Sequence, residues 1–192
     1  KICSDEIETI TFCAAAAVTK SEITITNVDL GHLDAPLAAL ERMNVKFTCS
    51  SGSIKIFKPD GQYRATNITT GVYPQLLTDE QPLFGVLATQ AEGESSIHDW
   101  IYEGRQGYLL ALEQMGARVV LEDKNHAKII GPTTLHGAEI RTPDLRAGAS
   151  ILIAALVATG ESVIYNAEII DRGYEKLEQR LKSLGADVRR VK

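Results

Sequence analysis

The fold can be inferred from the stretch Leu112-Glu-Gln-Met115-Gly116-Ala117, where an expected helix ends on a hydrophobic residue followed by a tight stop. The same pattern occurs at residues 40–45 and 181–186, so its leading leucines are 72 residues (40 to 112) and 69 residues (112 to 181) apart. Self-similarity at a nearly fixed period indicates one supersecondary unit packed against copies of itself. The sequence therefore predicts a threefold repeated α/β unit in a single domain, with copies at about residues 1–65, 66–135 and 136–192.

Each copy carries two helical patterns of different character. The first is apolar on nearly every face, as in a helix buried on most sides, and it occupies residues 11–18, 83–91 and 151–158. A strand led by glutamate should follow, starting at Glu22, Glu94 and Glu161. The second helix is amphipathic, and two short strands should come after it. These patterns predict βαβαββ units whose first helices share a common interior walled by strands.

Composition limits the class of protein. The chain has 192 residues, 44% hydrophobic and 23% charged, which is typical of a globular domain with a proper core. A net charge of −5 argues against nucleic acid as a partner. No run of about 18 apolar residues is present, so we expect no membrane span and a cytoplasmic location. The cysteines, Cys3, Cys13 and Cys49, fit no metal spacing, and neither a metal nor a cofactor is expected.

The chain opens at Lys1 without a methionine, within what should be the middle of a strand-to-helix unit. We therefore expect it to be part of a longer protein. A site shared with the missing part would be represented here by only some of its residues.

Two aspartates stand where apolar helices should begin. Asp79 precedes Glu80-Gln81-Pro82, and Asp144 follows Pro143. A carboxylate in this position commonly caps the helix, worth about 1 kcal/mol, and a catalytic role is the alternative for both residues. Arg146 favours a functional role for this region, because a cation in the first turn opposes the helix dipole unless an anion binds there.

Arginines recur at two further helix entrances. Arg105 precedes the second helix of the middle copy, and Arg172 precedes that of the third. A single arginine of this kind is usually solvated, but the equivalent loops of Arg105 and Arg172 point to one rim, and with Arg146 three arginines stand at helix entrances of adjacent copies. With backbone N–H groups at helix starts, they predict a site for phosphate or carboxylate.

Six motifs in a fixed order resemble the enolpyruvyl transferases. They are Asp5-Glu-Ile-Glu-Thr9, Thr78-Asp79-Glu-Gln81, Glu103-Gly-Arg105, Met115-Gly-Ala117, Asp144-Leu-Arg-Ala147 and Asp171-Arg-Gly-Tyr-Glu175. The resemblance implies a two-domain enzyme, each domain an inside-out α/β barrel of three βαβαββ units, with substrates in the cleft between them. This chain resembles the C-terminal domain, and the N-terminal domain of the same protein is its implied partner.

The family reaction adds an acceptor hydroxyl to C2 of phosphoenolpyruvate and then expels phosphate. By the resemblance, Arg105, Arg146 and Arg172 bind the phosphate and carboxylate of phosphoenolpyruvate. Asp79 matches the proposed general base, and Asp144 matches an aspartate that helps to move protons near the reacting carbons.

The resemblance also implies supporting roles. Asp5 and Glu103 match charged positions that order the arginines, and the backbone of Ile101 matches a contact with a nucleotide sugar. The family's cysteine acid lies in the other domain, so this chain alone should be nearly inactive.

The acceptor is the remaining choice. Asp171-Arg-Gly-Tyr-Glu175 favours the branch that uses the 3′-hydroxyl of UDP-N-acetylglucosamine, and the sister branch uses shikimate 3-phosphate. The chain departs from the family pattern around the site, at Glu6, Ile10, Gly104 and Gln106. These departures leave open a divergent, non-catalytic anion-binding module of the same fold.

Overall fold

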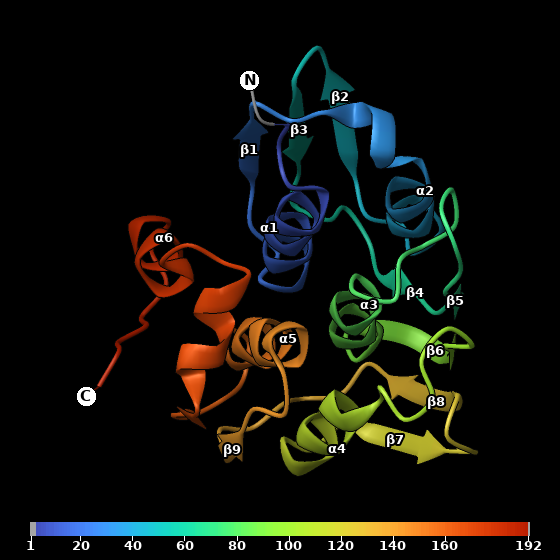
Figure 1. The fold of residues 1–192 in the computed structure, drawn as a ribbon, viewed down its shortest axis with the longest axis vertical. Coiled ribbons are helices and arrows are strands. Elements are labelled where there is room, and N and C mark those ends of the chain that lie inside the picture. Colours follow the sequence, from blue (N-terminus) through green and yellow to red (C-terminus); the bar gives the residue numbers. More distant parts are fainter. Residues whose placement is uncertain (1–2, 192) are drawn as a thin grey trace.

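Three helices pack against one another in the middle of the molecule (Figure 1). They are α1 (Glu6–Val18), α3 (Gln81–Ala88) and α5 (Leu145–Ala155), and each contacts the other two. The computed structural model describes residues 3–191, so Lys1 and Ile2 of the expected opening segment lie outside the described residues. The chain has an α/β fold in which the predicted apolar helices occupy the interior.

The sequence explains why these helices lie inside. Every residue of α3 is buried, and in α1 only Glu6 and Glu8 are not. Alanines make up much of α1, and their small side chains let neighbouring helices approach closely while still removing apolar surface from water. A helix that is apolar all round can be stable only where neighbours cover every face.

The strands lie around this helical centre in three sheets. The first is antiparallel, in the order β1 (Ile23–Thr26), β3 (Ser53–Ile56), β2 (Phe47–Ser50). The second has the order β4 (Tyr63–Arg64), β6 (Ala91–His98), β8 (His126–Gly131), β7 (Arg118–Leu121), and β5 (Asn67–Thr69) also pairs with β6. The third is a parallel pair, β9 (Glu139–Arg141) and β10 (Val163–Tyr165).

The second helices lie on the outside (Figure 1), and the sequence pattern quoted first ends each of them. They are α2 (Asp34–Arg42), α4 (Gly107–Gln114) and α6 (Leu177–Ser183). After each, one residue takes a positive φ, at Asn44 (63°), Gly116 (95°) and Gly185 (102°). The next backbone N–H then reaches back to the leucine carbonyl that leads the pattern, at 3.0, 2.9 and 3.1 Å. This is a left-handed helix stop, and its geometry is the same at all three places.

The element order differs from the prediction at the two ends of the described chain. The range 66–135 has the whole order β5-α3-β6-α4-β7-β8. Described residues before α1 form no strand, and none follows α6 up to residue 191. Two short 3-10 helices, η1 (Leu30–His32) and η2 (Ala167–Arg172), were not predicted. Near the C-terminus, Arg190 instead binds Asp171 with N–O distances of 2.5 and 2.7 Å.

Packing between α3 and α4 depends on a glycine. A Cβ placed on Gly85 would lie 2.4 Å from the Tyr108 hydroxyl oxygen and 2.5 Å from its ring carbon Cε2. Gly85 and Tyr108 are both buried, so the ring has no free space to enter. The close approach of the two helices therefore requires a residue without a side chain.

We predict that Gly85→Ala lowers the free energy of unfolding by about 2 kcal/mol, because overpacking forces the Tyr108 ring to shift. Urea unfolding measures the change. Gly61→Ala is the matched control, since a Cβ there meets nothing closer than 3.9 Å. Equal stability of the two variants would contradict this packing.

Candidate anion-binding site

The carboxylate of Asp79 lies between two guanidinium groups. Its Oδ1 is 2.5 Å from Nη2 of Arg105, and its Oδ2 accepts a hydrogen bond from Nε of Arg146 at 3.0 Å. Asp79 belongs to the turn before α3, Arg105 to the loop before α4, and Arg146 to the first turn of α5. The three side chains are partly exposed, at 30%, 21% and 13%, so the cluster is accessible from solvent. Three separate helix entrances therefore meet at one point, as the sequence predicted for Arg105 and Arg146.

Arg146 is held from several sides and still has a free donor. Its Cζ lies 5.3 Å from the centre of the Tyr174 ring, and Tyr174 in turn lies 3.0 Å from Oγ1 of Thr11. Burial opposes the charge on Arg146, but the Tyr174 hydroxyl and the Asp79 carboxylate keep its pKa above the ordinary value. Its Nη1 is buried and has no hydrogen-bond partner among the described residues. A buried donor of this kind is suited to an anionic ligand.

The two aspartates at helix starts have different roles. Asp144 is the N-cap of α5, and its Oδ1 accepts hydrogen bonds from the backbone N–H groups of Arg146 (2.8 Å) and Ala147 (2.9 Å). The cap expected at Asp79 is wrong, because α3 begins one residue later and Glu80 is its N-cap residue. The Asp79 carboxylate is committed to the arginines instead.

Arg172 does not join the cluster through any contact within residues 3–191. It is exposed at the end of η2, with no ion pair or hydrogen bond from its side chain to those residues. Its neighbour Gly173 lies against the cluster, since a Cβ there would be 3.2 Å from Nη1 of Arg146. Arg172 is therefore the sequence neighbour of a residue that lies against the site, and its guanidinium has no partner among the described residues.

The loop that leads to Arg105 is anchored by Asp99, which the sequence analysis missed. Asp99 is fully buried, and its Oδ1 accepts hydrogen bonds from Thr70 Oγ1 (2.8 Å), Ile101 N (3.1 Å) and Tyr102 N (3.2 Å). Its Oδ2 accepts a further hydrogen bond from Thr78, the neighbour of Asp79. Asp99 thus fixes Ile101 and the turn that carries Asp79 with one side chain.

Asp5 and Glu103 contact other groups than expected. Asp5 is the N-cap of α1 and accepts a hydrogen bond from Glu8 N at 2.9 Å. Glu103 pairs with Lys124 at 2.7 Å on the exposed side of its loop. Neither is paired with an arginine in the part of the chain that the structure describes, and the groups that order Arg146 are Asp79 and Tyr174.

A second carboxyl group lies next to Asp79. Glu80 is 1% exposed, its Oε2 accepts a hydrogen bond from Leu77 N at 3.1 Å, and its Oε1 is buried without a partner among the described residues. The pKa of Glu80 is raised to about 7, chiefly by burial and also by the charges of Glu6 and Asp79, against the opposing hydrogen bond from Leu77 N–H. Sequence reasoning had no signal for this, because burial of a glutamate at a helix start depends on the neighbouring helices.

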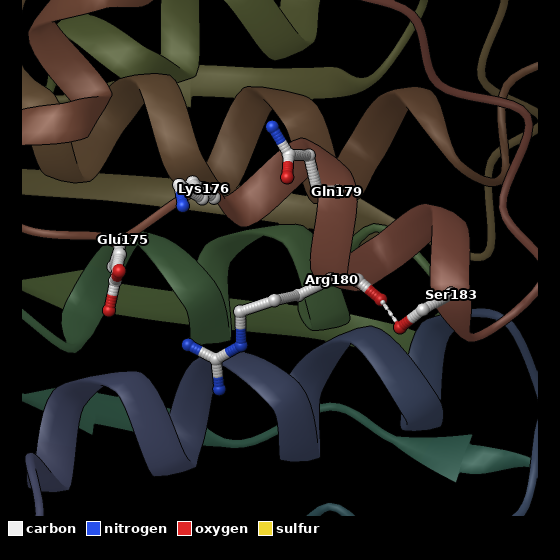
Figure 2. A pocket seen from close by; sticks show the side chains of 5 residues that line it. All are labelled: Glu175, Lys176, Gln179, Arg180 and Ser183. Carbon is white, nitrogen blue, oxygen red and sulfur yellow. Dashed lines mark hydrogen bonds between the residues drawn. The ribbon is translucent and has the colours of Figure 1, made fainter.

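Two shallow hollows lie away from the cluster. One, on α6, is lined by Glu175, Lys176, Gln179, Arg180 and Ser183 (Figure 2), and Arg180 reaches from it toward α1, where it pairs with Glu8 and covers the Phe12 ring. Arg180 therefore links α6 to α1 through an ion pair and a cation–π contact. The other is lined by Glu103 together with His98, Trp100, Asp123, Lys124, Asn125 and His126.

No group of three or more His, Cys, Asp or Glu side chains within residues 3–191 could hold a metal ion. None of the helices in that range is both long and apolar enough to span a membrane.

Comparisons with known proteins agree on one family. The family model described as EPSP synthase (3-phosphoshikimate 1-carboxyvinyltransferase) matches residues 1–181. The UDP-N-acetylglucosamine 1-carboxyvinyltransferase of Halothermothrix orenii is 38% identical over 192 residues, which are 100% of this chain and 46% of that protein. The protein of the same name from Campylobacter lari is 41% identical over 191 residues, which are 100% of this chain and 45% of that protein. The chain spans about half the length of the curated relatives it matches.

Solved structures are similar over the whole chain. The enolpyruvyl transferase NikO from Streptomyces tendae has a TM-score of 0.91 and 29% identity, covering 98% of this chain and 44% of that one. The EPSP synthase of Acinetobacter baumannii has a TM-score of 0.75 at 18% identity, and the match covers 100% of this chain and 44% of that one. The second likeness concerns the fold alone.

We predict that Asp99→Asn lowers the free energy of unfolding by about 3 kcal/mol, because buried donors lose a charged acceptor. Chemical denaturation measures the loss. Asp187→Asn, at an 86% exposed side chain, is the control and should change stability by less than about 0.5 kcal/mol. A similarly small loss for Asp99→Asn would show that Asp99 does not anchor the loop.

Glu80 should make stability depend on pH. Its pKa of about 7 lies above the ordinary 4.5, so between these values the folded chain keeps a proton that the unfolded chain releases. The contribution of Glu80 to stability is therefore fully present below about pH 4.5 and is lost as pH rises through 7, by about 3 kcal/mol in total. Unfolding at pH 5 and pH 8 measures this loss. Glu80→Gln should remove it, and an unchanged pH dependence in that variant would contradict the assignment.

Proposed function

Because the chain belongs to the EPSP synthase family of enolpyruvyl transferases, we propose that it is the phosphoenolpyruvate-binding domain of such an enzyme. The acceptor is the 3′-hydroxyl of UDP-N-acetylglucosamine, which makes the reaction the first committed step of peptidoglycan synthesis. One observation carries the proposal: Asp79, Arg105 and Arg146 come from separate helix entrances and meet at one accessible point. An acid beside two fixed cations suits a reaction that needs a proton acceptor next to a bound anion.

The arginines bind phosphoenolpyruvate. Its phosphate and carboxylate carry several negative charges, and fixed guanidiniums can neutralise them and stabilise charge that moves during the reaction. Arg146 offers its buried Nη1, Arg105 lies on the other side of Asp79, and Arg172 contributes its uncommitted side chain. No metal or cofactor takes part in this proposal.

Asp79 accepts the proton of the attacking hydroxyl. The hydroxyl oxygen bonds to C2 of phosphoenolpyruvate while C3 receives a proton, which gives a tetrahedral intermediate that carries phosphate. Phosphate then leaves as the bond between C2 and the phosphate oxygen breaks and C3 gives up a proton, while the new bond to the acceptor oxygen stays. Asp144 helps to move protons near these carbons and also caps α5, so it keeps the first turn of that helix in place.

The backbone of Ile101 contacts the nucleotide sugar in this proposal. Asp99 holds Ile101 N at 3.1 Å, so that contact would be made by a rigid loop. Asp5 and Glu103 support the site indirectly, since the first caps α1 and the second pairs with Lys124 beside that loop.

We further propose how the chain fits the complete enzyme. The central α1, α3 and α5 with sheets outside support an inside-out α/β barrel of three repeated units. The coverage of about 45% of the relatives supports a second, N-terminal domain that supplies the cysteine acid for C3. The buried Cys13 is unsuited to that task, because burial raises its pKa to about 12. The complete enzyme would act in the cytoplasm.

A second acceptor has one observation in its favour. The family model is described as 3-phosphoshikimate 1-carboxyvinyltransferase, so shikimate 3-phosphate must be tested. The names of the relatives at 37–41% identity favour UDP-N-acetylglucosamine.

Phosphate release from phosphoenolpyruvate by the complete reading frame tests the proposal. Each acceptor is offered separately. Release with UDP-N-acetylglucosamine alone is expected. Release with shikimate 3-phosphate alone would assign the sister reaction, and release with neither would favour a non-catalytic anion-binding module.

We predict that Arg172→Ala in the complete enzyme raises the KM for phosphoenolpyruvate by about 10- to 100-fold, the cost of one charge-assisted hydrogen bond. The KM for UDP-N-acetylglucosamine should change by less than about twofold. Steady-state kinetics with each substrate varied measures both values, and Arg118→Ala, at an exposed arginine of β7, is the control. Equal losses for both substrates would contradict the role of Arg172.

A further inference from the structure

A buried carboxyl group without a cation lies beside the Asp79 site. Glu80 is 1% exposed, and the single hydrogen bond of its carboxyl group among the described residues comes from the backbone N–H of Leu77 to Oε2. Oε1 is buried with no partner in that part of the chain. A carboxylate that is buried and unpaired is costly, so this geometry favours the protonated acid.

The charges around Glu80 act in the same direction. Glu6 faces it from α1, and Asp79 precedes it in the same turn, so both nearby acids oppose its ionisation. The cations of the neighbouring site, Arg105 and Arg146, pair with Asp79, and Glu80 forms no ion pair with the described residues. The N-terminus of α3 favours a negative charge, but burial has the larger effect, and the pKa of Glu80 is about 7.

Other elements packed on α3 bring their ionisable groups elsewhere along the helix. Tyr108 of α4 meets α3 at Gly85, more than one turn from Glu80. Strand β8 meets the opposite end of α3, where Gly131 lies against the Ala88 carbonyl oxygen. Glu80 is therefore governed by α1 and by the Asp79 site.

We propose that Glu80 is a positioning residue that sets the charge of the Asp79 site by holding or releasing one proton. While Glu80 is protonated, the two guanidiniums of Arg105 and Arg146 face only the Asp79 carboxylate. The net positive charge that remains is available to an anionic ligand. When Glu80 gives its proton to solvent, a second carboxylate stands in the same turn and repels an incoming anion.

The effect on phosphoenolpyruvate rests on the proposed function. Affinity for this anion should fall as pH rises through the pKa of Glu80. A neutral amide at position 80 keeps the shape of the side chain and an acceptor for Leu77 N–H, so it should imitate the protonated state at every pH.

Direct titration tests the proton independently of catalysis. Side-chain carboxyl carbons are labelled with ¹³C in the complete protein, and the Glu80 signal is assigned by its loss in Glu80→Gln. We expect that signal to titrate near pH 7. Titration near the ordinary 4.5 would overturn the proposal even if the enzyme is active.

Kinetics tests the consequence. Between pH 6 and pH 8, the KM for phosphoenolpyruvate should rise about tenfold more in the wild type than in Glu80→Gln. Glu113→Gln, which removes a charge from an exposed position of α4, should behave like the wild type. Equal pH profiles of wild type and Glu80→Gln would overturn the proposal.

The two tests separate the two hypotheses. If no variant releases phosphate with either acceptor, the proposed function fails, and the titration still decides whether Glu80 holds the proton. If Glu80→Gln does not fold, Glu80→Asp serves to assign the signal, and the wild-type titration alone is decisive.

Discussion

Contacts from one carboxylate to two guanidiniums join three helix entrances of this molecule. Asp79 holds Arg105 and Arg146 at 2.5 and 3.0 Å, although the three residues belong to three different helix entrances. In the proposed reaction the two guanidiniums bind the anion and Asp79 accepts the proton. The same contact places a proton acceptor next to the cations.

The fold makes this meeting possible because α1, α3 and α5 are buried against one another. Packing of α3 against α5 brings Asp79 and Arg146 together at the starts of these helices, and α4, which contacts both, brings in Arg105 from the loop before it. Each outer helix ends in the same left-handed stop, and after α2 and α4 the chain continues into a strand, β2 and β7 respectively. Asp99 and Tyr174 add rigidity, since each is buried and contacts a residue of the cluster or its neighbour. The packing of the helices therefore determines where the charged groups of Asp79, Arg105 and Arg146 meet.

Patterns local in sequence predicted much of this. Uniformly apolar segments identified the buried helices, and arginines at helix starts, where stability would disfavour them, predicted that Arg105 and Arg146 converge. The N-cap at Asp144 was correct, whereas the cap at Asp79 was not. Glu80 and Asp99 could not be recognised, because their roles depend on burial by other elements; Asp99 binds Thr70 and Thr78, 29 and 21 residues away. Arg172 stays a prediction, because its partner would be a ligand.

The most direct test separates anion binding from proton transfer at one residue. Equilibrium binding of phosphoenolpyruvate and phosphate release are both measured for the complete protein and for Asp79→Asn. If the arginines bind the anion and Asp79 accepts the proton, the variant should bind phosphoenolpyruvate at least as tightly as the wild type and lose turnover by about 100-fold or more. Binding that weakens in parallel with turnover would contradict this account, because Asp79 would then be needed to form the anion site.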